Sequence, residues 1–168
     1  MNKVLAAWNE ASEPVAVEAM LACCASRRWA QTMVVQRPCD SIDHLHQSAD
    51  DAWSTMEEPD WLEAFAAHPR IGAHSPSSHD KSSDWSRQEQ SAVAQTGPEI
   101  LARLATANKS YETRFGFTYI VCATGKTAEQ MLLILERRLA NNREIELQEA
   151  AEQQRLIMHI RLTKWLSE

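Results

Sequence analysis

Apolar residues recur at steps of three and four along most of the chain, which is the spacing of amphipathic α-helices. The strongest stripe follows a capping residue at Ser41 and comprises Ile42, Leu45, Ala49, Ala52, Trp53 and Met56. A second stripe covers residues 100–115, and a last long helix is expected from about Glu144 to Leu166. We therefore predict an all-α fold, a multi-helix bundle of about eight to nine helices.

Two helix starts can be predicted from capping residues. Thr127 is followed three residues later by Gln130, which matches a capping box. Ser83 or Asp84 is expected to cap a helix that runs toward Gln95.

Two stretches interrupt the helical pattern. Residues 71–83 are rich in serine and contain Gly72 and Pro76, so we expect a long irregular loop. Residues 117–123 are rich in β-branched and aromatic side chains, which favours extended backbone. A lone extended segment cannot form a sheet, so we expect a connector buried in the core. Its backbone groups then need partners, and a bound ligand could supply some of them.

Composition fits an ordinary water-soluble protein. The 168 residues suit one domain, spanning residues 1–168, and hydrophobic residues make up 44% of them. A net charge of -6 and a pI near 5.5 argue against a nucleic-acid partner. No apolar run approaches the roughly 18–20 residues of a membrane span, and the first residues lack a signal-peptide core. We expect a cytoplasmic protein without a membrane partner.

The stretch Phe65-Ala66-Ala67-His68-Pro69-Arg70-Ile71-Gly72 is the leading candidate for chemistry. It puts His68 in the last turn of an apolar helix, which Pro69 then stops. A histidine held by rigid backbone at the edge of the core suits a general acid or base. The alternative is a histidine at a helix C-terminus whose only role is a favourable interaction with the helix dipole.

The segment 84–90 could bring a carboxylate to the same cleft, but it also has two interpretations. Ser86 and Glu89 match a capping box, in which both side chains would bind backbone N–H groups. If the helix starts at Ser83 or Asp84, they share one face and can meet a ligand near the helix N-terminus.

Three arginines near the end of the chain fall into two groups. Arg161 lies among apolar residues, so we expect partial burial and a carboxylate or anionic ligand as its partner. Arg137 and Arg138 are expected on a solvated face.

Several other patterns have weak support as functional sites. His68, His74 and His79 could suggest a metal site, but two of them lie in the serine-rich stretch and no helical pair sets their spacing. The four cysteines lack zinc-type spacing, so buried thiols without a role are expected. A metal-dependent hydrolase using the three histidines and a non-enzymatic helical interaction protein therefore remain as alternatives.

Five short motifs, taken in order, resemble one known family. They are Ala67-His68-Pro69-Arg70-Ile71-Gly72, Ser86-x-x-Glu89-Gln90, Asn108-x-x-Tyr111-x-x-x-Phe115-Gly116-Phe117, Glu136-Arg137-Arg138-Leu139 and Arg161-Leu162. With Asn9 near the start, the resemblance to 2-oxo-4-hydroxy-4-carboxy-5-ureidoimidazoline (OHCU) decarboxylase covers essentially the whole chain. The chain departs from the family at Thr118, where the family usually has proline.

The resemblance implies an all-α homodimer without a cofactor or metal that converts OHCU to (S)-allantoin and CO2 in urate breakdown. His68 would be the catalytic acid, with Glu89 beside the ring on which it acts. The resemblance implies substrate-binding roles for Pro69, Ser86, Arg87, Gln88, Glu89, Gln90, Tyr119, Ile120, Val121, Cys122, Ala123 and Arg161.

Overall fold

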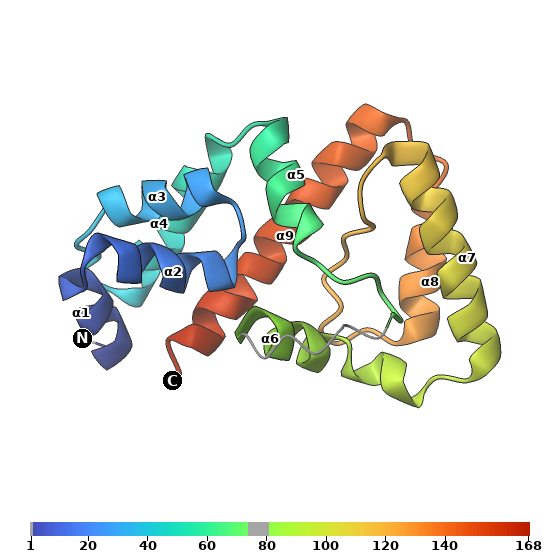
Figure 1. The fold of residues 1–168 in the computed structure, drawn as a ribbon, viewed down its shortest axis with the longest axis horizontal. Coiled ribbons are helices and arrows are strands. Elements are labelled where there is room, and N and C mark those ends of the chain that lie inside the picture. The colour runs from blue at the N-terminus through green and yellow to red at the C-terminus, as the bar shows by residue number, and fades with distance from the viewer. Residues whose placement is uncertain (1, 74–80) are drawn as a thin grey trace. The chain divides into compact units, whose positions relative to one another are not determined.

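The computed structural model describes residues 2–73 and 81–168, which form nine α-helices, one short 3₁₀ helix and no strand (Figure 1). The all-α prediction is therefore confirmed. The elements are α1 (Lys3–Glu10), α2 (Glu13–Cys23), α3 (Arg27–Val35), α4 (Ile42–Ser54), α5 (Glu58–Ala66), α6 (Lys81–Glu89), η1 (Ser91–Gln95), α7 (Pro98–Phe115), α8 (Ala128–Arg138) and α9 (Arg143–Trp165). Within the described ranges, every helix is too short or too polar to cross a lipid bilayer.

The chain divides into two compact units. Unit 1 runs to Ala64 and resumes at Arg155, and unit 2 comprises Phe65–Gln154. That residues 1–168 work as one domain stays a prediction.

Unit 1 is built around tryptophan and methionine side chains. Helix α3 packs against both α2 and α4. Trp29 on α3 is completely buried and donates its ring N–H to the carbonyl of Ala49 at 3.2 Å. Cys23, Cys24 and Cys39 are also buried in this unit, and no cysteine in the described ranges forms a disulfide.

Unit 2 encloses the predicted non-helical connector. Helices α7 and α8 pack against each other (Figure 1), and the chain between them lacks regular structure over residues 116–123. Apart from the half-buried Thr118, every residue from Phe117 to Ala123 is buried, as expected. The ring centroid of Tyr111 on α7 lies 5.8 Å from that of Phe117 and 5.3 Å from that of Tyr119. Aromatic packing therefore fixes the start of the connector.

One predicted helix start is confirmed and one is wrong. The Thr127 hydroxyl accepts from Gln130 N–H at 3.2 Å, and the Gln130 side chain accepts from Thr127 N–H at 2.9 Å, which completes the capping box. Helix α6 is already formed at Lys81, so Ser83 and Asp84 lie inside it rather than at its cap. Serine and aspartate suit both caps and first turns, so a polar run such as Lys81–Asp84 does not mark the first residue.

The end of α7 depends on the backbone freedom of glycine. Gly116 has a φ of 82° and donates its N–H to the carbonyl of Glu112 at 2.9 Å, which is a left-handed C-terminal cap. Because a side chain is strained in this conformation, we expect Gly116→Ala to lower the free energy of unfolding by about 1–2 kcal/mol. No atom would clash with the added methyl group. Asparagine tolerates positive φ better than alanine, so Gly116→Asn should lose less unfolding free energy than Gly116→Ala. Urea denaturation measures both losses.

Candidate functional site

His68 lies just beyond the helix that was expected to contain it. Helix α5 ends at Ala66, and the backbone N–H of His68 donates to Phe65 O at 3.1 Å in a single turn. The expected position in the last turn is therefore off by two residues, because Pro69 excludes helical backbone at the residue before it. His68 is half-buried, so its ring is neither enclosed in the core nor fully in solvent.

A buried amide on α9 contacts the His68 ring. The Nε2 atom of His68 lies 2.7 Å from Oε1 of Gln154, whose side chain has no exposed surface. We did not predict Gln154, because it follows Glu152 and Gln153 and precedes Arg155, a polar run that is typical of a solvated helix face. The buried Ala150 and Ala151 at three- and four-residue steps were the signal that Gln154 faces inward.

The preceding residue of α9 binds the connector. Gln153 Oε1 accepts a hydrogen bond from the backbone N–H of Cys122 at 2.9 Å. Two consecutive glutamines therefore hold the predicted acid and the predicted binding segment, which are more than fifty residues apart in the chain.

Hydrogen bonds from α7 and from Gln90, the residue that follows α6, hold the turn after His68. Asn108 on α7 donates to the carbonyl of Ile71 at 2.9 Å, and Gln90 accepts from the N–H of Gly72 at 3.2 Å. Arg70 forms a two-pronged ion pair with Glu112, with both N–O distances at 2.6 Å. These contacts stabilise one backbone conformation next to His68.

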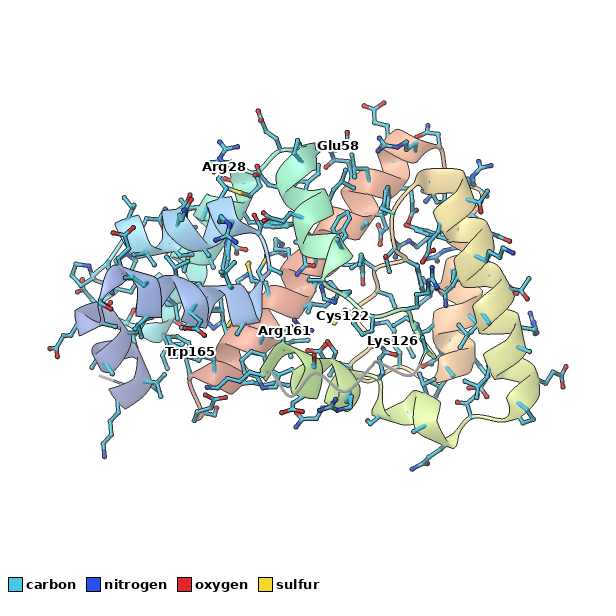
Figure 2. The ribbon with its side chains drawn as sticks, viewed as in Figure 1. Arg28, Glu58, Cys122, Lys126, Arg161 and Trp165 are labelled. Atoms are coloured by element: carbon cyan, nitrogen blue, oxygen red, sulfur yellow. The ribbon has the colours of Figure 1, made fainter. Side chains whose placement is uncertain are left out.

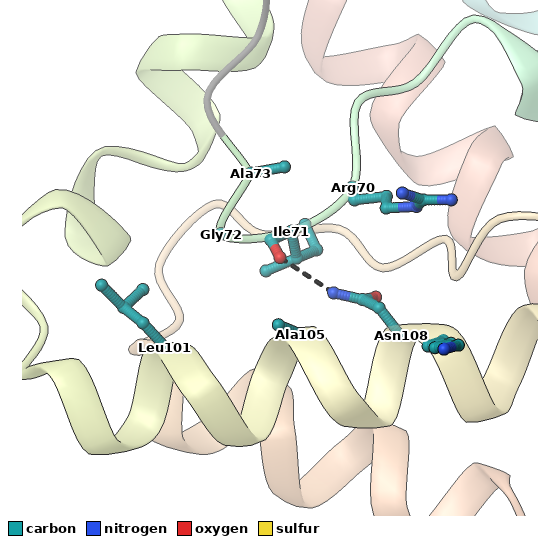
Figure 3. Close-up of a pocket in the computed structure, with 8 residues that line it drawn as sticks. Arg70, Ile71, Gly72, Ala73, Leu101, Ala105 and Asn108 are labelled. Carbon is teal, nitrogen blue, oxygen red and sulfur yellow. Dashed lines mark hydrogen bonds between the residues drawn. The ribbon is translucent and has the colours of Figure 1, made fainter.

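A pocket of about 420 Å³ lies beside this turn (Figure 3). Its lining includes Arg70, Gly72, Leu101 and Asn108. The Oδ1 atom of Asn108 is buried, and it has no hydrogen-bond partner in the described part of the chain.

Helix α6 presents the predicted serine and glutamate on one side. Ser86 is buried and Glu89 is half-buried, and their three-residue separation puts them on neighbouring positions of one face. Arg87 and Gln88 are exposed, and Arg87 pairs with Asp84 in the preceding turn. Because α6 has formed by Lys81, Ser86 is not in its first turn, so the expected use of helix-terminal N–H donors beside Ser86 is wrong.

A second pocket, of about 340 Å³, joins α6 to the His68 segment. Four predicted substrate-binding residues are among those that line it: Pro69, Ser86, Arg87 and Gln90. His68 directly precedes the first of these residues, and Glu89 directly precedes the last. The structure thus brings together two sequence motifs that lie about twenty residues apart.

Side chains of unit 2 bind the backbone of the connector at several points. Arg138 donates to the carbonyl of Ile120 at 2.7 Å. Lys126 donates to the carbonyl of Cys122 at 2.8 Å, and both residues are labelled in Figure 2. The hydroxyl of Tyr119 donates to the carbonyl of Met131 at 2.9 Å. Protein side chains therefore supply some of the hydrogen-bond partners that a ligand had been expected to supply to the connector backbone. The N–H of Val121 donates to no acceptor in the described ranges.

The expectation that Arg138 faces solvent is wrong, although Arg137 is exposed as predicted. Arg138 is only 2% exposed and donates through Nε to Glu146, which is fully buried, at 2.7 Å. The hydroxyl of Tyr111 also donates to Glu146. Burial raises the pKa of Tyr111 well above its usual range, and its bond to Glu146 raises the pKa further, so the phenol keeps its proton.

Arg161 belongs to unit 1, where it is buried as the sequence suggested. Burial raises the pKa of the neighbouring Cys24 thiol to about 12, although the positive charge of Arg161 favours the thiolate. The contribution of Arg161 to substrate binding stays a prediction.

Two of the three histidines considered for a metal site, His74 and His79, lie outside the described residues. Among the residues that are described, no three histidine, cysteine, aspartate or glutamate side chains are placed to hold a metal ion.

Comparison with known proteins identifies the family. The profile of OHCU decarboxylase matches residues 9–163. This chain belongs to the OHCU decarboxylase family. The family match covers both units and every predicted site residue.

Two curated relatives illustrate the range of similarity. The uric acid degradation bifunctional protein TTL of Arabidopsis thaliana is 38% identical over 148 residues, which are 87% of this chain and 46% of the plant protein. The OHCU decarboxylase of Haloferax volcanii is 23% identical over 78% of this chain and 76% of its own length. The chain thus spans about half the length of the plant protein and about a quarter of two Bacillus bifunctional proteins.

Solved structures agree with the fold. A crystal structure of an OHCU decarboxylase determined in the presence of (S)-allantoin has a TM-score of 0.79 at 32% identity. It is matched over 94% of this chain and all of that one. An (S)-allantoin synthase has a TM-score of 0.72 at 17% identity, over 96% of this chain and 53% of that one, which supports the fold alone.

Proposed function

We propose that this protein decarboxylates OHCU and protonates the product stereospecifically to give (S)-allantoin. Family membership supports the reaction class, and a relative of 32% identity was crystallised with (S)-allantoin. The observation that carries the proposal is the shared anchoring of His68 and Cys122 by Gln154 and Gln153 on α9. It joins the proposed acid to the proposed binding segment in one compact unit.

The chemistry requires one proton and an electron sink. Loss of CO2 breaks a carbon–carbon bond and leaves its electron pair on the ring carbon, where the imine and carbonyl groups of the substrate can delocalise it. The protein must then deliver a proton to one face of that carbon. A histidine titrates near neutrality and suits this role. We propose that the reaction uses no cofactor.

The remaining predicted residues have binding roles in this proposal. Glu89 would bind N–H groups of the substrate ring and favour the protonated form of His68. Pro69, Ser86, Arg87 and Gln90 surround the 340 Å³ pocket and would contact the substrate there. Gln88, which is exposed, and Arg161, which lies in unit 1, are kept as predicted contacts.

We further propose that the active protein is a cytoplasmic homodimer. The dimer is implied by the resemblance to the family, and it can be tested by light scattering on the purified protein during gel filtration. A single species of about 38 kDa is expected, twice the 19.0 kDa of one chain. A monomer of full activity would contradict the dimer without affecting the proposed reaction.

The reaction itself is tested with substrate made in place from urate by the enzymes that precede this step. Circular dichroism then follows the appearance of (S)-allantoin as the protein is added. We expect a rapid optical signal above the slow, racemic spontaneous reaction. No acceleration would contradict the proposal and favour a non-enzymatic interaction protein. Acceleration that a chelator abolishes would instead favour metal-dependent chemistry.

A further inference from the structure

We propose that Gln154 is a positioning residue that fixes the ring orientation and the tautomer of His68, so that Nδ1 exchanges the proton with the substrate. This inference rests on the proposed function, because it assigns a role within the same reaction. It is carried by the 2.7 Å contact between His68 Nε2 and Gln154 Oε1, together with the complete burial of Gln154.

The contact determines which nitrogen carries hydrogen. A carboxamide oxygen can only accept, so Nε2 of His68 must be the donor when it faces Oε1. A buried amide oxygen without a donor carries a desolvation penalty, and this penalty favours the Nε2–H tautomer. A neutral imidazole in this place therefore keeps its hydrogen on Nε2 and has its lone pair on Nδ1.

The rest of α9 keeps Gln154 in place. Gln153 donates to Glu149 at 3.2 Å while its own oxygen accepts from Cys122, so this turn of the helix is fixed to the connector. Ala150 and Ala151, one turn earlier, are buried, so the same face of α9 lies in the interior of unit 2. The amide of Gln154 is thus pre-organised rather than brought in by the substrate.

This tautomer determines the path of the proton during the reaction. In the reacting state His68 is protonated on both nitrogens, and Nε2–H stays bonded to Gln154. As the carbon–carboxylate bond breaks, the Nδ1–H bond also breaks, its electrons remain on Nδ1, and the proton bonds to the ring carbon. His68 is left neutral with hydrogen on Nε2, and water returns a proton to Nδ1 before the next turnover.

A neutral amide is suited to this task. It orients the imidazole without adding a negative charge that would hold the proton on the ring during transfer. A glutamate at position 154 would still accept from Nε2, whereas methionine has a similar length and no comparable acceptor. Gln154→Glu and Gln154→Met therefore separate the hydrogen bond from the packing of the side chain.

Nitrogen-15 NMR of protein labelled in its histidine rings tests the tautomer directly. The resonances of His68 are assigned as those missing from His68→Asn, among the six histidines of the chain. At a pH where the ring is neutral, we expect hydrogen on Nε2 in the wild type and in Gln154→Glu, and a mixture of tautomers in Gln154→Met. A wild-type ring with hydrogen on Nδ1 would overturn the inference whether or not the protein decarboxylates OHCU.

Kinetics provide the second readout. We expect Gln154→Met to lower kcat by about tenfold to a hundredfold with a smaller change in KM, as for a misplaced catalytic group. Gln154→Glu should recover part of the loss, and Gln148→Met, at an exposed position of the same helix, should retain wild-type kcat. Wild-type kcat in Gln154→Met, or a loss confined to KM, would overturn the positioning role. Absence of activity in the wild type would instead count against the proposed function.

Discussion

Replacing His68 with asparagine is expected to lower kcat for OHCU decarboxylation by about 10²–10⁴-fold, the usual contribution of a general acid. Asparagine cannot deliver a proton at neutral pH, so only spontaneous protonation from water remains. The product should also lose its excess of the (S) enantiomer, because the proton no longer arrives from one fixed face. Both quantities follow from the circular dichroism assay, run with substrate generated in place.

The fold should survive this substitution. Gln154 Oε1 is a buried acceptor that loses the His68 donor, and the loss of such a hydrogen bond lowers the free energy of unfolding by about 1–3 kcal/mol. His44→Asn, at an exposed histidine of α4, is the matched control and should keep full activity. Full activity and stereospecificity in His68→Asn would contradict the mechanism, whereas loss of far-ultraviolet dichroism would indicate a structural role instead.

Breaking the buried ion pair of Arg138 and Glu146 is expected to give the largest loss of stability. Glu146→Leu leaves the guanidinium of Arg138 buried without its carboxylate, and Arg138→Met leaves the carboxylate without its cation. Each change should lower the free energy of unfolding by about 3–5 kcal/mol. The double variant should recover much of the loss, because it removes both charges from the core. Urea denaturation followed by circular dichroism measures all three differences.

An exposed pair in the same unit provides the comparison. Arg103 on α7 and Glu136 on α8 lie 2.7 Å apart, with side chains about half exposed. The corresponding changes, Arg103→Met and Glu136→Leu, should each cost no more than about 1 kcal/mol. Similar losses for the two pairs would show that burial of Arg138 does not control its contribution.

Local signals in the sequence were sufficient for much of the fold. Helical periodicity over residues 42–56 and the capping box at Thr127 depend on residues that are close in the sequence. Both features can therefore be recognised from the sequence alone. The connector was recognised for a similar reason, since its composition contrasts with the helices on both sides. Helix α6 was placed less well, because a polar segment offers several equivalent first residues.

Features that depend on distant contacts could not be predicted in the same way. Arg138 has the same residue type as its exposed neighbour Arg137, and the sequence around it does not show that Glu146, in the first turn of α9, lies beside it. Gln154 is equally inconspicuous, because its hydrogen-bond partner is 86 positions away. The motifs around His68 and Ser86 were found because their residue types suit catalysis and because they resemble a known family, whereas the residues that support them carry no such mark.

The attachment of the connector to α9 has a consequence for synthesis on the ribosome. Residues 117–123 leave the ribosome about thirty positions before Gln153, whose side chain binds Cys122, and well before Glu146, which holds Arg138 against Ile120. Nascent chains that stop short of Gln153 would therefore expose a strongly apolar segment with unsatisfied backbone, a form that chaperones bind and proteases cut. The site would therefore be completed only after the first half of α9 has emerged from the ribosome.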